Sequence, residues 1–488
     1  MQPENNPFDS SVGSGKLASP RNIALLFAFI ILCGILISTQ GVGAGLGLMA
    51  LPFVWLYLYW LFKNPIVGLY SAIGLGFILL GITRYFKNLG QVGMAMDGIL
   101  FLTYLAFIFK NFRTKIDWTP AKKDVTVLAA IWLGYAFLQF FNPEVQDRQA
   151  WLAGMRGISL YMMLIVPLVL LFVDDMKKLN TFFYVWGIFS ILGTMKGIMQ
   201  LTIGVDPWEK AWLDAGGAVT HIIFGKLRVF SFFSDAAQFG SDQGYTAVVF
   251  TIMSFAKENW KKRFFFLTVA LLAYFGMFIS GTRGAISVPL GGFALYFVLK
   301  KNWYVMSTGF ILLAVVYIFF KYTTIGQDNQ QIRRMRSAFD PNDPSLQVRL
   351  ANQRKLSTYL ASRPFGGGIG HAGVKAQKYL PNAFLSQVAT DSWYVLIWAE
   401  QGIIGLLLHL FILFYIIIKA SYLIMKKIRD PVLKIKMTAL VAGMMGIMVA
   451  SYGNAALGTM PTGPLIYVGM AVMLNAMALD DKIIAEKS

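Results

Sequence analysis

The chain has 488 residues, of which 57% are hydrophobic and only 14% are charged. A soluble protein of this length would carry roughly a quarter charged residues, so the composition excludes an ordinary soluble enzyme. The formal net charge of +19 would suit nucleic acid, but no stretch resembles a nucleic-acid-binding module. Cationic loops beside anionic lipid account for the charge, and no nucleic-acid partner is expected.

Apolar runs long enough to cross a bilayer recur along the whole chain. They predict an all-α polytopic membrane protein with about twelve to fourteen transmembrane helices. The expected spans are 22–40, 44–62, 65–82, 94–110, 124–141, 159–174, 180–203, 241–257, 263–281, 283–300, 303–321, 392–419, 434–456 and 460–479.

Loop charge gives an expected orientation. With the N-terminus inside, the short cytoplasmic turns hold nearly all the dense lysine clusters, as the positive-inside rule requires. Residues 1–21 then form a cytoplasmic tail without a signal core, 22–480 a single transmembrane domain, and 481–488 a cytoplasmic tail. The clusters comprise Lys110, Lys115, Lys122, Lys123, Lys257, Lys261, Lys262, Lys300, Lys301, Lys426, Lys427, Lys434 and Lys436.

No cofactor or metal is expected. Cys33 is the only cysteine, and His221, His371 and His409 are too far apart to match a metal-binding spacing. The chain also lacks a Walker motif and a dinucleotide-binding glycine fingerprint.

Two segments on the outer side, about 204–240 and 322–390, are too long to be plain connectors. In the second, leucines at helical spacing over 346–360 predict an amphipathic helix, which the Arg363-Pro364 pair should end. Gly366–Gly370 follows, a backbone suited to close approach of another surface or a ligand.

Arg283 is the only charge from Phe264 to Leu299, in the turn "SGTRGA". This turn is too short to carry the side chain far into water, and an arginine beside the bilayer needs an anionic partner. A planar guanidinium matches phosphate oxygens with paired hydrogen bonds. Together with Lys226, Arg228, Arg349 and Arg363 on the same outer side, Arg283 would suit a lipid diphosphate; a solvated or snorkelling cation is the alternative for each.

Three further charges fall inside spans, where they are costly and are usually paired or functional. Asp97 and Lys196 are expected to form structural ion pairs between helices or to serve the site. Glu400 lies about two and a half turns after Asp391, so we expect it to support the structure around the site.

The outer end of the span at 392–419 carries a recognisable pattern. Asp391-Ser392 is followed by nine residues, then by Gly402 and Gly405. This resembles the signature of bacterial O-antigen ligases, with aspartate in place of histidine. The "SGTRGA" turn, Arg349 followed by "SRPFGGGIG", and "RVFSFFSDAAQFG" around Arg228 are similar to other parts of the O-antigen ligase and polymerase superfamily, over roughly residues 220–420.

The resemblance implies a metal-independent, inverting membrane glycosyltransferase in the bacterial inner membrane, acting at its periplasmic face. Its donor would be an undecaprenyl-diphosphate-linked glycan, and its acceptor another saccharide or lipid A–core. Arg228, Arg283 and Arg349 would contact the diphosphate, with Lys226 nearby, and Asp391 would replace the histidine that activates the acceptor hydroxyl.

The residues leave alternatives open for Asp391. A carboxylate can accept the hydroxyl proton, but Asp391 also precedes a helix and would serve as an N-cap. His371, after the glycine run, is the other candidate base, with loop packing as its alternative. Arg363 and the glycines Gly402 and Gly405 are weaker supporting candidates.

Two other classes compete with an enzyme. A flippase for the same lipid-linked glycan should show cations through the depth of a cavity and two related halves, whereas here the unexpected cations gather on one side. A non-catalytic envelope assembly protein is the third class. Aspartate in place of histidine puts ligase activity in doubt and is compatible with a polymerase or an exopolysaccharide enzyme.

Overall fold

The computed structural model describes residues 20–40, 42–85, 93–112, 115–223 and 225–487. Within these ranges the chain is almost entirely helical, and its strands are one antiparallel pair, β1 (Ile222–Ile223) with β2 (Lys226–Leu227). The prediction of an all-α polytopic protein is therefore confirmed. The expected N-terminal tail lies outside the described residues except for its last two.

Every predicted span falls on a helix, as the apolar runs require. The helices of the bundle and its flank are α1 (Pro20–Gln40), α2 (Val42–Lys63), α3 (Ile66–Ile82), α4 (Gly93–Asn111), α5 (Asp124–Leu138), α6 (Arg148–Met155), α7 (Tyr161–Phe172), α8 (Met176–Thr202), α11 (Ala236–Ser254), α12 (Trp260–Ile279), α13 (Ser287–Leu299), α14 (Trp303–Tyr322), α18 (Trp393–Lys426), α19 (Pro431–Ala450), α20 (Thr462–Leu474) and α21 (Ala476–Lys487).

Among the described residues, eight of these spans are long and apolar enough to cross a membrane unaided, and the α20–α21 pair makes a ninth if its 59° bend is one broken span. The stretches at 27–39, 47–63, 66–82 and 283–299 are apolar but shorter. The span predicted at 159–174 is the second half of a longer helical stretch, Arg148–Phe172, which continues through the π-helical turn η3 (Arg156–Leu160).

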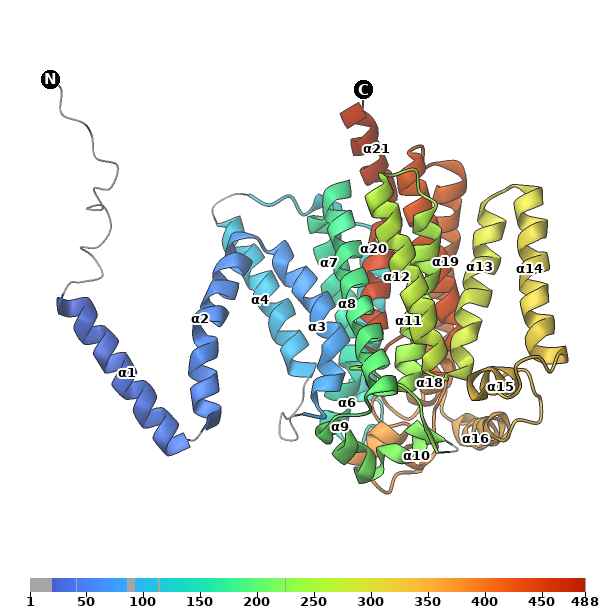
Figure 1. Ribbon diagram of the computed structural model, residues 1–488, viewed down its shortest axis with the longest axis horizontal. Helices are drawn as coiled ribbons and strands as arrows, with labels where there is room; N and C mark the ends of the chain where they lie inside the picture. The colour runs from blue at the N-terminus through green and yellow to red at the C-terminus, as the bar shows by residue number, and fades with distance from the viewer. Residues whose placement is uncertain (1–19, 41, 86–92, 113–114, 224, 488) are drawn as a thin grey trace.

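The two ends of the bundle differ in chemistry. At one end, which we call the basic end, short lysine-rich connectors meet: Lys436 pairs with Glu258 at 3.1 Å and Lys482 with Asp174 at 3.6 Å. The two long connectors, 203–235 and 323–392, lie together at the opposite end, which we call the loop end (Figure 1). This is the separation that the loop charges predict.

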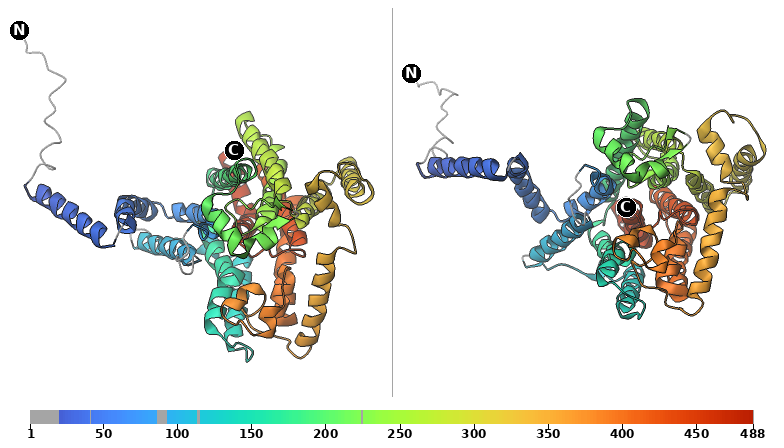
Figure 2. Two further views of the ribbon diagram at one scale, coloured as in Figure 1. Left: turned by 60° about the horizontal axis from the view of Figure 1, so that its bottom comes forward. Right: turned by 90° about the horizontal axis from the view of Figure 1, so that it is seen from below.

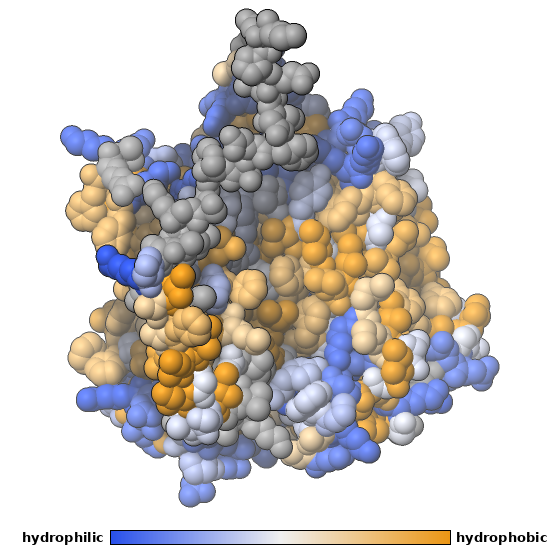
Figure 3. Space-filling view, turned by 60° about the vertical axis from the view of Figure 1, so that its left-hand side comes forward, coloured by the Kyte–Doolittle hydropathy of each residue, from blue (hydrophilic) through white to orange (hydrophobic). Residues whose placement is uncertain are grey.

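Between the two ends the surface is hydrophobic. Figure 3 shows a broad apolar band with hydrophilic residues above and below it. Large apolar side chains such as Phe101, Leu271 and Ile311 are 66%, 61% and 64% exposed. Such exposure suits a lipid environment. Helices α1 and α2 stand apart from the bundle at one flank (Figure 1).

Helix α11 forms the centre of the bundle, packed against α12, α13 and α19. Helices α13 and α19 pack closely because glycine lies at their contact. A β-carbon on Gly446 of α19 would lie 2.4 Å from the Val288 carbonyl oxygen of α13. This packing fixes the turn before α13, which carries Arg283, against the loop end of α11.

The loop end is covered by short helices, seen from below in Figure 2. The first long connector supplies α9, α10 and the strand pair, and the second supplies α15, α16 and α17. Their bounds are α9 (Pro207–Trp212), α10 (Ala218–His221), α15 (Gln330–Ser337), α16 (Pro344–Leu360) and α17 (Phe384–Gln387), with single turns η1 (Thr119–Ala121), η2 (Gln139–Phe141), η4 (Leu213–Gly217), η5 (Arg283–Ile286) and η6 (Val374–Lys378).

Helix α16 is the amphipathic helix that the leucine spacing predicts. Its leucines Leu356 and Leu360 are buried, and it ends before Arg363-Pro364 as expected. Asp343 caps its first turn, accepting hydrogen bonds from the amides of Ser345 and Leu346.

Two of the three charges inside spans, Asp97 and Lys196, form ion pairs. Asp97 in α4 accepts from the Arg156 guanidinium at 3.1 Å and the Tyr161 hydroxyl at 2.9 Å, joining two helices. Lys196 near the end of α8 reaches the first long connector instead of another span. The expected pairing is present in both cases.

Candidate functional site

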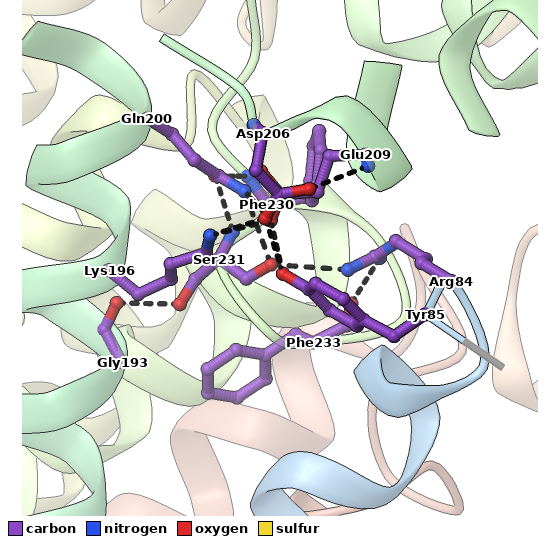
Figure 4. Close-up of polar contacts among 10 residues, drawn as sticks. All are labelled: Arg84, Tyr85, Gly193, Lys196, Gln200, Asp206, Glu209, Phe230, Ser231 and Phe233. Carbon is purple, nitrogen blue, oxygen red and sulfur yellow. Dashed lines mark hydrogen bonds and ion pairs between the residues drawn. The ribbon is translucent and has the colours of Figure 1, made fainter. Parts of the chain in front are cut away.

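The first long connector is tied to the bundle by the buried guanidinium of Arg84, just after α3. Arg84 donates to the carbonyl oxygens of Ser231 at 3.1 Å and Ser234 at 2.8 Å, and also to that of Phe233 (Figure 4). Its plane stacks between the rings of Trp212 and Phe230, 4.5 and 4.4 Å from their centroids. Because the Arg84 guanidinium binds three carbonyl oxygens and stacks on two rings, it fixes the path of the chain just after Arg228.

A second polar group fixes the start of the same connector. The Lys196 ammonium pairs with Asp206 at 3.0 Å and Glu209 at 3.1 Å, and Gln200 donates to Glu209 at 2.8 Å (Figure 4). Burial alone would raise the pKa of Asp206, but the Tyr85 hydroxyl, the Glu209 amide and Lys196 hold that pKa below its usual value.

Arg228 lies half-buried where this connector returns to the bundle. Its guanidinium donates to the Thr220 carbonyl oxygen at 2.9 Å and to the Thr282 hydroxyl at 3.1 Å, while its Nε has no partner among the described residues. Burial and the nearby charge of Arg283 lower the pKa of Arg228. The side chain therefore points at the turn that carries Arg283.

The turn that carries Arg283 is held by contacts that Thr282 and Arg283 make with other parts of the chain. Thr282 donates to the Ala236 carbonyl oxygen at 2.7 Å, at the start of α11. Arg283 itself reaches into the second long connector, donating to the Ser337 hydroxyl at 2.9 Å and the Ser345 hydroxyl at 2.8 Å, and forming an ion pair with Asp343. Its partner is thus a carboxylate 60 residues away, which the sequence did not reveal.

Helix α15 adds a third guanidinium, that of Arg334, which the sequence analysis missed. Its Nη1 lies 3.7 Å from the position of a β-carbon on Gly281, two residues before Arg283. Burial and the charges of Arg228 and Arg283 lower the pKa of Arg334 to about 10. We call Arg228, Arg283 and Arg334 the guanidinium cluster.

The only sequence signal for Arg334 is the arginine-rich run "QQIRRMRS". That run does not distinguish its members. Arg336 donates to the Thr323 hydroxyl at 3.2 Å and stacks on Phe319, and Arg333 is exposed. The fold alone turns Arg334 toward the other two cations.

Arg349 and Asp391 form an ion pair on the neighbouring side of α16, with Nε and Oδ2 3.3 Å apart. Both remain accessible, with 35% and 51% of their side chains exposed. They line a small crevice with Asn352, Gln353 and Ser392. We call this the carboxylate crevice.

The N-cap role that was the alternative for Asp391 is filled by the next residue. Ser392 is the N-cap of α18, and its hydroxyl accepts from the Val395 amide at 3.5 Å. The carboxylate of Asp391 is therefore not occupied in capping and faces the crevice.

Helix α16 connects the guanidinium cluster to the carboxylate crevice. Ser345, which contacts Arg283, and Arg349, which contacts Asp391, lie four residues apart and so on one face of the helix, about 6 Å along its axis. The α19–α20 connector lies beneath both: Gly453 approaches Arg349, and Asn454 approaches Gly284. The two groups are therefore parts of one region at the loop end.

Two predicted cations lie outside this region. Arg363 pairs with Glu144 at 3.0 Å and stacks on Tyr359, 4.2 Å from the ring centroid. Lys226 is exposed on strand β2, with no contact to the cluster among the described contacts. The prediction that all the outer cations share one phosphate site is not supported by these positions.

The glycines of the motif shape the fold. Gly402 breaks α18 with φ of 68°, and a β-carbon there would lie 2.0 Å from the Pro364 carbonyl oxygen. Gly366 packs against the same break, and Gly405 lies against Tyr135. The glycine run thus approaches α18 at Gly366, and Val145 and the start of α6 at Gly368 and Gly370.

The remaining predicted residues are buried in this packing. Glu400 accepts from the Ala372 amide at 3.4 Å and is only 3% exposed. The Nε2 of His371 accepts from the amides of Gln146 and Asp147 at 3.1 Å, and its Nδ1 contacts the Ile369 carbonyl oxygen at 2.9 Å. Burial lowers the pKa of His371. Both ring nitrogens are occupied, so the loop-packing alternative describes this histidine.

The part of the chain that carries this site is similar to known proteins. Residues 267–410, which carry Arg283, Arg334, Arg349 and Asp391, match the O-antigen ligase family. The chain is also 24% identical over 330 residues to an O-antigen polymerase of Salmonella muenchen, a match that covers 65% of this chain and 80% of that protein. The resemblance to the O-antigen ligase and polymerase superfamily is confirmed, and with the apolar helices it indicates a multi-pass protein of a bacterial inner membrane.

Proposed function

We propose, from the chain's similarity to the O-antigen ligase and polymerase superfamily, that it transfers a glycan from an undecaprenyl-diphosphate-linked donor to a saccharide acceptor. The reaction takes place at the periplasmic face of the membrane. This orientation is supported by the lysine-rich connectors at the opposite end of the bundle, since positive loops face the cytoplasm.

The observation that carries the proposal is the guanidinium cluster at the loop end. Arg228, Arg283 and Arg334 come from three separate parts of the chain; Asp343 forms an ion pair with Arg283, and the charge of Asp235 acts on Arg228. Like charges repel, so such a cluster persists at a cost unless an anion binds there. A diphosphate, with its many acceptor oxygens, fits planar donors of this kind.

The transfer follows from the guanidinium cluster and the carboxylate crevice, which α16 connects. The acceptor hydroxyl oxygen attacks the anomeric carbon as the bond to the diphosphate oxygen breaks, and that oxygen leaves with the electron pair. Asp391 takes the hydroxyl proton, and the guanidinium groups stabilise the charge that develops on the diphosphate. Attack from the side opposite the leaving group inverts the anomeric centre. Charge neutralisation by arginine serves the role that a metal ion has in other transferases.

Arg349 links the two steps. The Arg349 guanidinium occupies the Asp391 carboxylate, with Nε and Oδ2 3.3 Å apart. When Arg349 turns toward the leaving diphosphate, Asp391 becomes free to accept the proton. Both side chains are exposed enough to exchange partners.

The acceptor in the proposed reaction is another saccharide repeat unit. The relative from Salmonella is a polymerase by name, and aspartate stands where ligases of the family carry histidine. Transfer to lipid A–core, as in a ligase, is the second candidate.

Deletion of the gene, followed by a gel of surface glycans, tests the function. A polymerase predicts lipopolysaccharide caps of a single repeat unit, and a ligase predicts uncapped core. Unchanged lipopolysaccharide with lost exopolysaccharide would indicate an exopolysaccharide polymerase. Unchanged glycans of every kind would contradict the proposal.

Purified protein tests the roles. Asp391→Asn should abolish transfer while donor binding remains, because the amide cannot accept the proton. Exposed Asp340, on the same connector, provides the control substitution Asp340→Asn, which should retain activity. A fully active Asp391→Asn protein would remove this residue from the mechanism.

A further inference from the structure

An exposed aromatic ring lies at the loop end beside the carboxylate crevice. Phe384 begins α17 and is 45% exposed, although the next two residues, Leu385 and Ser386, are buried. Its ring packs on that of Tyr359 in α16, with the centroids 4.8 Å apart and the planes inclined by 23°. Among the described residues, no second ring or cation packs on Phe384. The ring therefore offers a face to a further stacked group.

A guanidinium holds the pair of rings in place. Arg363 lies over the Tyr359 ring, 4.2 Å from its centroid, and pairs with Glu144 at 3.0 Å. The Tyr359 hydroxyl donates to the same carboxylate at 3.4 Å. Tyr359 also packs against a small apolar core that includes Leu385. We call Tyr359, Phe384 and Arg363 the aromatic stack. Because the protein fixes these groups in advance, a ligand that stacks on Phe384 orders few side chains.

Polar groups beside the stack are accessible to a ligand. Arg363 donates through Nη1 to the Tyr359 carbonyl oxygen at 3.0 Å, but its Nη2 has no partner among the described residues. The side chains of Arg363 and Glu144 are 31% and 33% exposed. An apolar ring face with polar groups at its edge matches a sugar, which has C–H faces and hydroxyl edges. A lipid chain would cover the ring but leave the polar groups without partners.

The aromatic stack continues from the carboxylate crevice along α16. Asn352, which lines the crevice, and Tyr359 are seven residues apart, so they lie on one face of the helix and about 10 Å apart along its axis. The following connector has the same arrangement. Phe384 lies five residues before Ala389, whose carbonyl oxygen accepts from Asn352 at 3.4 Å. A glycan whose end enters the crevice at Asp391 can therefore extend along α16 to the stack.

We propose that the aromatic stack binds the acceptor glycan, at a sugar behind the one that reacts. The C–H face of that sugar packs on Phe384, and its hydroxyls exchange hydrogen bonds with Arg363 and Glu144. The identity of this glycan as the acceptor rests on the proposed function, and the stack adds the path that the acceptor follows away from Asp391. Arg363 then serves the acceptor and not the donor diphosphate.

Binding of a lipid-free glycan to the full chain in detergent tests the proposal. The probe is an oligosaccharide of one repeat unit, released from the surface glycan of the producing strain, and saturation-transfer difference NMR measures its affinity. It has no lipid diphosphate for the guanidinium cluster to hold. We expect the wild type to bind it more tightly than its terminal monosaccharide, which is too short to reach the stack. Phe384→Ala should weaken binding of the oligosaccharide roughly tenfold, since it removes much of the apolar contact, and should abolish the preference.

Matched variants locate the effect. Phe384→Trp keeps a flat apolar face and should keep the preference. Trp208→Ala is the control, because Trp208 is also an aromatic residue at the loop end, 55% exposed and packed on Tyr85, but lies on the first long connector. Its loss should leave binding unchanged. If Phe384→Ala does not fold, Phe384→Leu carries the test, since leucine keeps apolar volume without a flat face and should also lose the preference.

The two proposals fail in different ways. Wild-type affinity in the folded Phe384→Ala or Phe384→Leu protein, or a wild type that does not bind the oligosaccharide, would overturn the acceptor subsite whatever the protein transfers. Binding that depends on Phe384, in a protein whose deletion leaves every surface glycan unchanged, would support a glycan site here and contradict the proposed transfer.

Discussion

The ion pair between Arg283 and Asp343 leads to a prediction with an unusual sign. The Asp343 carboxylate pairs with the guanidinium that the donor diphosphate is proposed to contact. Binding the donor must therefore displace Asp343 or bring a second anion beside it. We predict that Asp343→Asn, which removes the charge, tightens the binding of the diphosphate.

The magnitude follows from burial. Two unit charges about 4 Å apart interact by about 4 kcal/mol at an effective dielectric constant of about 20, and exposed pairs are worth about 0.2–1 kcal/mol. Arg283 and Asp343 are 27% and 12% exposed, so the pair lies between these limits. We expect a gain near 1.4 kcal/mol, or roughly tenfold in affinity. Asparagine caps a helix about as well as aspartate, so α16 should remain folded.

Titration of the protein in nanodiscs with undecaprenyl diphosphate measures the effect. Asp340→Asn is the matched control, because Asp340 lies on the same connector and its carboxylate, among the described residues, contacts only the Asn342 amide. The control accounts for a general loss of negative charge. Unchanged or weaker binding in Asp343→Asn, or an equal gain in Asp340→Asn, would refute the reasoning.

Three further predictions concern stability and transfer. Gly402→Ala should lower the melting temperature strongly, since φ is 68° and the new β-carbon would lie 2.0 Å from a carbonyl oxygen; Gly134→Ala, with open space at its β-carbon, should not. Because the pKa of Asp206 is depressed in the folded state, its contribution to stability is present above about pH 4 and lost as the pH falls further. Melting curves from pH 6 to pH 3 should therefore show a smaller acid loss in Asp206→Asn than in the wild type. Arg349→Ala should lower the rate of glycan transfer at saturating donor by at least about tenfold, measured with purified protein; a wild-type rate would exclude Arg349 from the step.

The sequence predicted the helices well because lipid imposes a simple rule. A segment that crosses hydrocarbon must satisfy its own backbone hydrogen bonds and be apolar over its length. The helix over 346–360 and its end before Arg363-Pro364 were equally readable from leucine spacing and proline geometry. The start at Arg148 was not, since Gly154, Arg156 and Gly157 interrupt the apolar pattern before α7.

The site was predicted in part. Arg283 was singled out because an isolated charge in a short turn must find a partner, yet that partner, Asp343, lies in a distant connector and no local pattern identifies it. Arg334 was missed because one helix carries three arginines, and only the packing of α15 against the Arg283 turn selects one. Arg363 and Lys226 lie at the loop end but outside the guanidinium cluster. The number of positive residues in a connector does not show which of them come together.

The capping role proposed as an alternative for Asp391 shows the limit of local rules. Both Asp391 and Ser392 are good N-cap residues, and the helix start differs between them by a single residue. The structure assigns the cap to Ser392, which leaves the aspartate facing Arg349. The break in α18 gives Gly402 a packing role, since a β-carbon there would lie 2.0 Å from the Pro364 carbonyl oxygen.

The most direct test of the central claim is an electron cryomicroscopy structure of the full chain with undecaprenyl diphosphate bound. We predict that the two phosphates lie among the guanidinium groups of Arg228, Arg283 and Arg334, with Asp343 turned away and the lipid tail along the bundle. Phosphates bound elsewhere, with these three arginines as they are in the empty protein, would contradict it.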